Sequence, residues 1–233
     1  MGKTLALLYI ASPALPIGSF SWSRGLEPAC QSGAVQGLDD LADFLAQSLR
    51  HGLGSFDLPL LAMSMPAAAA AAQGGSQGAS EGLERLIWLN DLSLAGRESR
   101  EFGLEEEEGG KAVKRLCLSL GLWPSCLPKA FVPGLVVGQA ILATCLGLGE
   151  ADRADVLESL AFAWLQNQVA AAARTLSLGQ SELQNLVLSL GPEVTRVAHK
   201  ALQASPRDLG QGLVGLAILS ARHELELSRL FRS

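Results

Sequence analysis

Residues 130–149 carry no charged side chain, and this run limits the chain to two architectures. A stretch of this length can cross a bilayer or form the buried core helix of a large helical bundle. The run contains Pro133, Gly134, Gly138 and Gln139, and neither a Lys/Arg cluster nor an aromatic belt marks its ends. We therefore expect a buried helix, and keep a helical membrane-associated protein as the alternative.

The rest of the chain also favours helices. Hydrophobic residues make up 48% and charged residues 18% of the chain, Ala, Leu and Gly dominate, and no alternating run is bounded by hairpin turns. The sequence therefore predicts an all-α, single-domain bundle of roughly ten helices over residues 1–233. The expected helices cover 24–31, a segment opening at 38, a segment opening at 57, 82–102, 105–120, 131–148, 152–175, 181–190, 193–204 and 213–230, with Gly191-Pro192 separating two of them.

Local patterns predict the surroundings of several segments. The alanine tract 67–72 leads into a Gly/Ser/Gln stretch at about 73–80, which predicts a flexible low-complexity loop. Asp57 before Leu58-Pro59 predicts a helix N-cap. The run Glu105–Glu108 predicts a solvated first turn. An apolar stripe on the last helix predicts a core face, and its members are Val214, Ile218, Ala221 and Leu225.

Charge and cysteine usage exclude several classes of protein. A net charge of −5 and a pI near 5.3 argue against a nucleic-acid-binding surface. The four cysteines are widely spaced and include no CxxC pair, so we expect reduced thiols in a cytoplasmic protein. The N-terminal apolar run is interrupted by Pro13 and Pro16, which is unlike a signal peptide.

Several segments match a catalytic or nucleotide-binding motif only in part. Gly109-Gly110-Lys111 lacks the other elements of a P-loop, and Gly210–Gly215 matches GxGxxG without a preceding strand. The three histidines and the cysteines do not cluster at the spacing of metal ligands. We expect no catalytic residue, metal or cofactor. A serine hydrolase using Ser21 or Ser23 with His223 remains a weaker alternative.

Two segments have the character of interaction sites. The loop from Leu15 to Glu27 combines rigid prolines, glycines and aromatics, which is typical of a docking loop, although a loop that plugs the core fits nearly as well. The chain ends on Leu230-Phe231-Arg232, and an aromatic residue next to arginines suits a tail that orders against a partner.

The same segments resemble the urease accessory protein F (UreF) family. The similarity lies in Ala11–Ser21 with Gly25-Leu26-Glu27, and it ends in Ser220–Glu224 followed by Ser228–Ser233. Between them the family order continues through Asp57–Leu60, Arg97–Glu101, Trp164–Ala171 and Leu178-Gly179-Gln180. The chain departs from the family pattern at Leu225-Glu226-Leu227, Glu105–Gly109, Arg174 and Ser177.

The resemblance implies a non-catalytic, cytoplasmic, all-α homodimer that matures urease. Members bind the D/H accessory protein on apo-urease and recruit the G-type GTPase, so that GTP hydrolysis is coupled to nickel insertion. It implies no membrane or nucleic-acid partner. The tail Arg222–Ser233 is expected to dock the D/H protein, and the Pro16–Glu27 loop with Arg97, Glu98 and Arg174 to face the GTPase and the dimer partner. The expected partner-binding residues are Pro16, Gly18, Phe20, Ser21, Glu27, Arg97, Glu98, Arg174, Gln180, Arg222, His223, Glu224, Ser228, Arg229, Phe231 and Arg232.

Overall fold

The computed structural model describes residues 1–73, 77–210 and 212–232, and all regular elements within them are helices. This confirms the all-α prediction. Short 3-10 helices lie at Ser19–Ser21 (η1), Glu150–Asp152 (η3) and Pro206–Asp208 (η4), and a π-helical segment at Ser48–Asp57 (η2). The α-helices are α1 (Lys3–Ile10), α2 (Leu26–Gln31), α3 (Leu38–Gln47), α4 (Leu58–Ala72), α5 (Gln77–Ala95), α6 (Arg100–Ser119), α7 (Leu135–Cys145), α8 (Arg153–Thr175), α9 (Gln180–Ala201) and α10 (Val214–His223).

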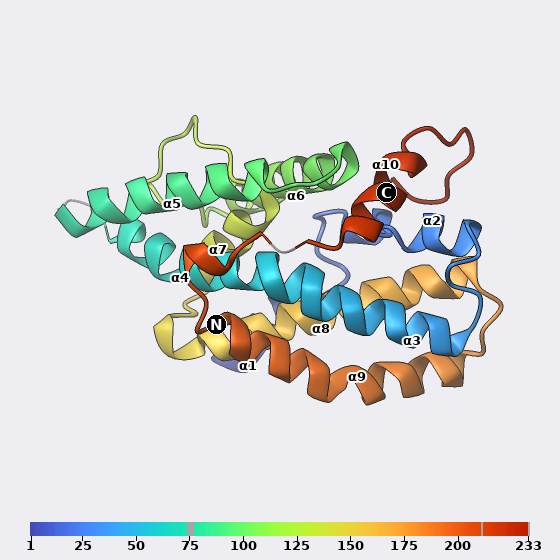
Figure 1. Ribbon diagram of the computed structural model, residues 1–233. Coiled ribbons are helices and arrows are strands. Elements are labelled where there is room, and N and C mark those ends of the chain that lie inside the picture. Colours follow the sequence, from blue (N-terminus) through green and yellow to red (C-terminus); the bar gives the residue numbers. More distant parts are fainter. Residues whose placement is uncertain (74–76, 211, 233) are drawn as a thin grey trace.

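A continuous rod made of α3, η2 and α4 crosses the middle of the molecule (Figure 1). The prediction that Asp57 caps a new helix is wrong, because the chain is already helical there. Asp57 has helical backbone angles (φ −64°, ψ −50°) and makes no capping hydrogen bond. The wider π-helical turn instead carries its carboxylate into the interior, where the side chain is 10% exposed.

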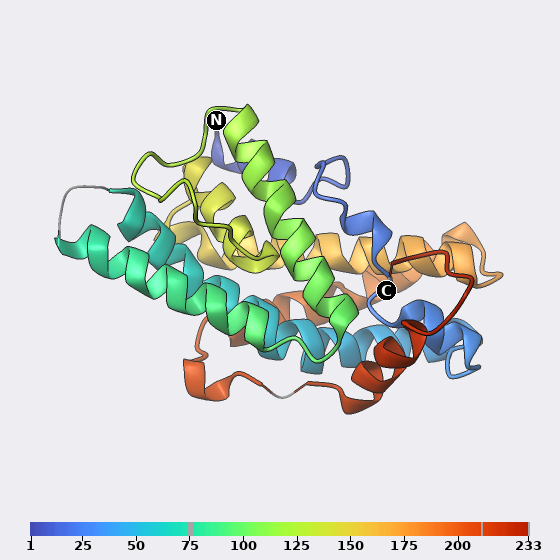
Figure 2. The same cartoon turned by 90° about the horizontal axis from the view of Figure 1, so that it is seen from above.

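The other helices pack around this rod. α4 contacts α5, α7, α8 and α9, and α6 lies across α7. Figure 1 shows α5 and α6 on one side of the rod and the antiparallel pair α8 and α9 on the other, and Figure 2 shows α10 and the tail beside α2. The core includes Leu41, Leu45, Leu61, Leu86, Ile141, Leu157 and Leu165.

Within the uncharged run 130–149, residues Leu135–Cys145 form the helix α7, which is shorter at both ends than the predicted helix 131–148. From Leu135 to Ala143 every residue of α7 is buried except Gln139, which is half-buried. At 1.5 Å per residue its 11 residues extend about 17 Å, far less than the ~30 Å of a bilayer core. Among the described residues the continuous helical stretch Leu38–Ala72 is long and apolar enough to cross a membrane, but 61% of its most apolar window is buried inside the protein. Neither the uncharged run 130–149 nor the stretch Leu38–Ala72 therefore supports the membrane alternative.

The Gly109-Gly110 pair lies inside α6, where it lets a neighbouring segment approach closely. A Cβ atom added at Gly110 would overlap the carbonyl oxygen of Pro133, and one at Gly109 would press on Leu135 at 3.0 Å. Lys111 forms ion pairs with Glu107 and Glu108 on the same helix. The pair is thus a packing feature between α6 and the start of α7.

The predicted helix 82–102 is two helices, and this changes the environment of the acidic run. α5 ends at Ala95, and Ser99 caps α6 by accepting the backbone N–H of Phe102 at 3.2 Å. The glutamates therefore follow the first turn instead of forming it. Glu105 and Glu106 are only 5% and 1% exposed, so the prediction of a solvated first turn is wrong for them.

Several helix boundaries also differ. α9 runs unbroken through Pro192, because Val187 and Leu190 before it and Val194 and Val197 after it are all buried along one face. α10 ends at His223, before the predicted limit at 230. Within the predicted loop at 73–80, residues 77–80 already belong to α5, whereas 74–76 lie outside the described residues.

Candidate functional site

The loop before α2 is bent so that its polar groups face the C-terminal tail. Gly18 and Gly25 take left-handed conformations (φ 76° and 84°), and Arg24 has a φ of 48°, which is unusual for a residue with a side chain. The bend starts α2 at Leu26 and buries the next residue, Glu27, to 1% exposure. A buried carboxylate requires hydrogen-bond donors, and the tail supplies them.

Glu27 holds the tail by its backbone. Its Oε1 accepts the N–H of Leu230 at 2.8 Å, and its Oε2 accepts the N–H of Phe231 at 2.9 Å. One residue further on, the N–H of Arg232 donates to the carbonyl oxygen of Ser21 at 2.8 Å. Three successive amides of the tail are thus bonded to the loop and α2, so the two predicted interaction segments form one structure, which we call the tail clamp.

His223 anchors the start of the same tail at the end of α10. Its Nδ1 lies 2.9 Å from Glu101 Oε1, and its Nε2 lies 3.2 Å from Glu27 Oε2, a close contact without hydrogen-bond geometry. Arg229 Nη1 donates to Glu101 Oε1 at 3.0 Å, and the Ser220 hydroxyl donates to Oε2 at 3.2 Å. Glu101 therefore ties α6 to both α10 and the tail.

Aromatic contacts complete the tail clamp. The Phe231 side chain is 6% exposed, and the Arg174 guanidinium lies 5.7 Å from its ring centroid. The Arg232 guanidinium lies 5.9 Å from the ring centroid of Trp22. Such contacts contribute modestly where the cation stays near water, so burial of Phe231 is the larger effect.

A second buried network lies under the loop and crosses four elements. The Arg24 guanidinium donates to Asp57 Oδ2 and to Glu105 Oε2, both at 2.7 Å. Arg97 donates to Asp57 Oδ1 at 2.7 Å and to Glu106 Oε2 at 2.8 Å. The carboxylate of Asp57 therefore bridges two arginines, and the network joins the loop, η2, the α5–α6 link and α6.

The two arginines decide the charge state of Asp57. Burial raises the pKa of this carboxyl, but the nearby Arg97 and Arg24 guanidinium groups outweigh it and hold the pKa at about 2. Burial lowers the pKa of the Arg24 guanidinium, but the carboxylates of Glu105 and Asp57 outweigh this effect and raise that pKa. Asp57 is thus ionised in the folded protein at every pH at which a cell operates.

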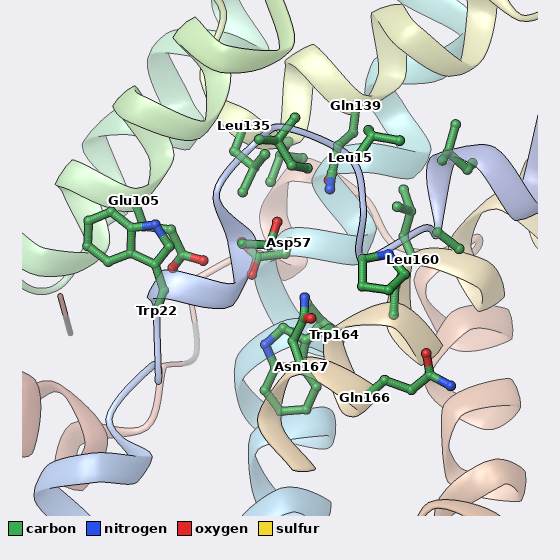
Figure 3. A pocket seen from close by; sticks show the side chains of 18 of the residues that line it. Leu15, Trp22, Asp57, Glu105, Leu135, Gln139, Leu160, Trp164, Gln166 and Asn167 are labelled. Carbon is green, nitrogen blue, oxygen red and sulfur yellow. The ribbon is translucent and has the colours of Figure 1, made fainter. Parts of the chain in front are cut away.

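A hollow of about 80 Å³ opens beside this network, between the N-terminal loop, α7 and α8 (Figure 3). Asp57 and Glu105 border it on one side, and Trp164 and Asn167 on another. The Gln168 side-chain oxygen is buried here without a hydrogen-bond partner. The space suffices for a few water molecules, which would satisfy that oxygen.

The tail clamp brings together only part of the predicted partner-binding set. Ser21, Glu27, Arg174, His223, Arg229, Phe231 and Arg232 meet in it. Arg97 belongs to the Asp57 network instead. Glu224 accepts the backbone N–H of Arg100 at 3.1 Å, and Gln180 is exposed at the start of α9. The side chains left exposed at the surface are Pro16, Phe20, Glu98, Arg222 and Ser228, while Gly18 is half-buried.

The apolar stripe of α10 is exposed, so its predicted role as a core face is wrong. Val214 is 73%, Ile218 48% and Leu225 85% exposed, and Ala221 is exposed as well. The inward side of α10 carries two polar residues at 0% exposure, Ser220 and His223, beside the half-buried Leu216 and Leu219. The acidic side chain of Glu101 explains this orientation, because only hydrogen-bonding groups can satisfy it.

Sequence reasoning did not single out Glu101, Asp57 or Glu105 as site residues. A signal was available, because acidic residues at helical positions flanked by apolar ones often pair with arginines inside a bundle. The partners lie 81 and 128 residues away in sequence, for Arg24–Glu105 and Glu101–Arg229 respectively, so no local pattern identifies them.

Two residues of the hydrolase alternative, His223 and Ser23, are engaged elsewhere. Both ring nitrogens of His223 face carboxylates, and the Ser23 hydroxyl accepts the backbone N–H of Glu27 at 3.3 Å. This is unlike a serine–histidine pair, in which the imidazole accepts from the serine hydroxyl. Among the described residues no group of three or more His, Cys, Asp or Glu is arranged to hold a metal ion.

Fold and site together define an all-helical protein whose buried charges hold its own loop and tail in place. Comparison with known proteins gives the family. The UreF family model matches residues 35–191. The chain is 40% identical to the urease accessory protein UreF of Chromohalobacter salexigens, covering 97% of this chain and 93% of the relative. It is 36% identical to that of Teredinibacter turnerae (99% of both) and 35% identical to that of Marinomonas sp. strain MWYL1 (99% and 94%). The chain belongs to the UreF family of urease accessory proteins, which implies a role in urease maturation.

Proposed function

We propose that this protein is a non-catalytic adaptor of urease maturation in the cytoplasm. It binds the D/H accessory protein on apo-urease and recruits the G-type GTPase, so that GTP hydrolysis is coupled to nickel insertion. Nickel is the cargo of that assembly and needs no site in this chain. Family membership supports the general role, and the tail clamp supports the division of surfaces described next.

The observation that carries the proposal is the tail clamp itself. It fixes the tail backbone through Glu27 and turns several side chains outward, among them Leu227 at 106%, Leu230 at 69% and the exposed Arg222. Exposed leucines beside an arginine form an apolar surface with a charged rim, which is the usual composition of a protein-binding patch. We assign this face to the D/H protein.

The loop offers a second surface. Phe20 is 60% exposed on η1, and the exposed Pro16 lies shortly before it. We assign this loop, with Glu98 and Arg174, to the GTPase and to the second copy of a homodimer. Arg97 serves it indirectly, because its side chain is 9% exposed and holds Asp57, which in turn holds Arg24 at the base of the loop.

A binding experiment tests these assignments. Arg222→Ala should weaken capture of the D/H protein, whereas Phe20→Ala should weaken recruitment of the GTPase and leave D/H capture unchanged. Each variant should keep the helical circular dichroism of the parent, because both side chains are exposed. Unimpaired complex formation by Arg222→Ala would remove this arginine from the docking surface, and Leu230→Ala would then test the rest of the tail.

A further inference from the structure

A cavity of about 370 Å³ is bordered by Glu98, a residue of the surface that we assign to the GTPase. Its walls come from η2, the α5–α6 link, α8 and the approach to α10. Pockets that bind small ligands commonly have volumes of about 300–1,000 Å³. The cavity is therefore large enough to receive one long side chain of a partner protein.

Three aromatic side chains line this cavity, Phe56 of η2, Phe102 of α6 and Trp164 of α8. All three are half-buried, so each keeps surface that an occupant can contact. The Arg97 guanidinium already lies 5.1 Å from the centroid of the Phe56 ring, so a cation of this shape fits against the wall. Aromatic ring faces attract cations, and the attraction is strongest where water is excluded.

The buried network beside the cavity carries more negative than positive charge. Arg24 and Arg97 supply two positive charges, and three buried carboxylates face them. These carboxylates belong to Asp57, Glu105 and Glu106. Burial raises the pKa of the Glu105 carboxyl, and the Arg24 guanidinium offsets this effect only in part. The network is therefore short of one positive charge.

Glu98 adds a further carboxylate to the cavity wall. A Cβ atom added at Gly212 would overlap Glu98 Oε1, so this carboxylate lies against the backbone that leads to α10. Within the described parts of the chain, neither a hydrogen bond nor an ion pair reaches it. His51 is the other titratable wall residue outside the network, and it is exposed. An anion would therefore meet net negative charge, whereas a cation would pair with Glu98 and leave the ion pairs of the network intact.

A guanidinium group suits such a cavity better than an ammonium group. It is planar and weakly hydrated, it stacks on aromatic faces, and it can donate two parallel hydrogen bonds to one carboxylate. We infer that this cavity receives an arginine side chain of the partner GTPase. The guanidinium group pairs with Glu98 and lies against the aromatic walls, and the aliphatic stem contacts Leu213 and Leu216. This inference rests on the proposed function, because Glu98 belongs to the surface assigned to the GTPase.

Butylguanidinium and butylurea are matched probes for the cavity, because both have a planar head on a butyl stem and they differ in charge. The probes are titrated into the full chain at constant ionic strength and followed by calorimetry. Butylguanidinium should bind saturably at one site, roughly three- to tenfold more tightly than butylurea. Equal affinities of the two probes, or no saturable binding of butylguanidinium, would overturn the inference.

Glu98→Lys tests the role of the carboxylate. The substitution places a cation at the cavity wall, so butylguanidinium binding should be lost while the affinity for butylurea stays unchanged. Because Glu98 is exposed, the variant should keep the helical circular dichroism of the parent. Glu84→Lys, at an exposed position of α5, is the matched control and should bind both probes as the parent does. Butylguanidinium binding that survives Glu98→Lys would contradict the pairing with Glu98.

The complex with the D/H protein tests which partner supplies the arginine. On that complex Glu98→Lys should recruit the GTPase at least about tenfold more weakly than the parent or Glu84→Lys. Saturating butylguanidinium should displace the GTPase, whereas butylurea at the same concentration should not. Release of the D/H protein or dissociation of a homodimer in its place would overturn the assignment to the GTPase. A parent chain that recruits no GTPase contradicts the proposed function, whereas recruitment that is insensitive to Glu98→Lys contradicts this inference alone.

Discussion

Glu27 accepts the backbone N–H of Phe231 at 2.9 Å, which joins α2 to a residue 204 positions away near the end of the chain. A backbone amide cannot be removed by substitution, so the specificity of this contact resides in the carboxylate. Chain ends usually fray, whereas this tail is held by the buried carboxylate of Glu27 in α2. Order in the tail therefore depends on the positions of Glu27 and of the loop before it.

Glu27→Gln should release the tail. A glutamine presents one acceptor oxygen and one NH₂ group, so it can serve Leu230 or Phe231 but repels the other amide. We expect loss of roughly 1.5–3 kcal/mol of local stability, the usual range for hydrogen bonds to a charged group. Amide hydrogen exchange of residues 229–232 should accelerate by about one to two orders of magnitude.

The matched control for that variant is Glu84→Gln, an exposed acid on α5. Its exchange profile should equal that of the parent. If the tail of Glu27→Gln stays as protected as in the parent, burial of Phe231 alone holds the tail and the carboxylate is dispensable.

Asp57→Asn should destabilise the whole domain. The substitution preserves shape but leaves Arg24 and Arg97 facing a neutral amide, whose NH₂ group opposes one of them. We expect a loss of roughly 2–4 kcal/mol in the free energy of unfolding. Urea denaturation measures it, with Asp43→Asn at an exposed position of α3 as the control. Equal midpoints for the two variants would contradict a stabilising role of the network.

The low pKa of Asp57 predicts that the free energy of unfolding falls in acid. The pKa of Asp57 is about 2 in the folded protein, below the ordinary value of about 3.9 in an unfolded chain. Its contribution is therefore complete above pH ~4 and is lost as the pH falls toward 2. The parent should lose on the order of 2 kcal/mol more than Asp57→Asn over this window, measured by urea denaturation at each pH. Parallel pH profiles would refute the assignment.

Gly110→Ala should weaken the contact between α6 and the segment before α7. The added methyl group meets the carbonyl oxygen of Pro133, which is backbone and cannot rotate away. We expect a cost of roughly 1–3 kcal/mol. Gly103→Ala on the same helix has open space around it and should be neutral or stabilising by up to about 1 kcal/mol. Thermal unfolding of the pair separates packing from helix propensity, and equal shifts would exclude the close approach.

Most of the helical framework could be predicted from the sequence, because its signals are local. The uncharged run predicted a buried helix, and the helical spacing of Leu41 and Leu45 matches the buried face of α3. The errors share a cause. Pro192 and Asp57 carry the local signals of a helix break and a helix start, but burial on both sides kept each helix continuous.

The candidate site was predictable only in part. The loop and the tail were recognised as separate interaction segments, but their junction depends on Glu101 and Glu27 meeting His223 across the fold. The orientation of α10 was missed for the same reason. Hydrophobic periodicity predicts which face of a helix is apolar, but it does not predict whether another element packs on that face. In α10 the buried carboxylate of Glu101 binds Ser220 and His223, so the apolar face is left exposed.

The most direct test of the adaptor role is urease activity and bound nickel in cells that lack their own F protein and receive this chain with its cognate partners. We expect active, nickel-loaded urease with the parent chain and reduced nickel content with Arg222→Ala. Nickel-free, inactive urease despite folded parent protein that captures the D/H protein would contradict the adaptor role.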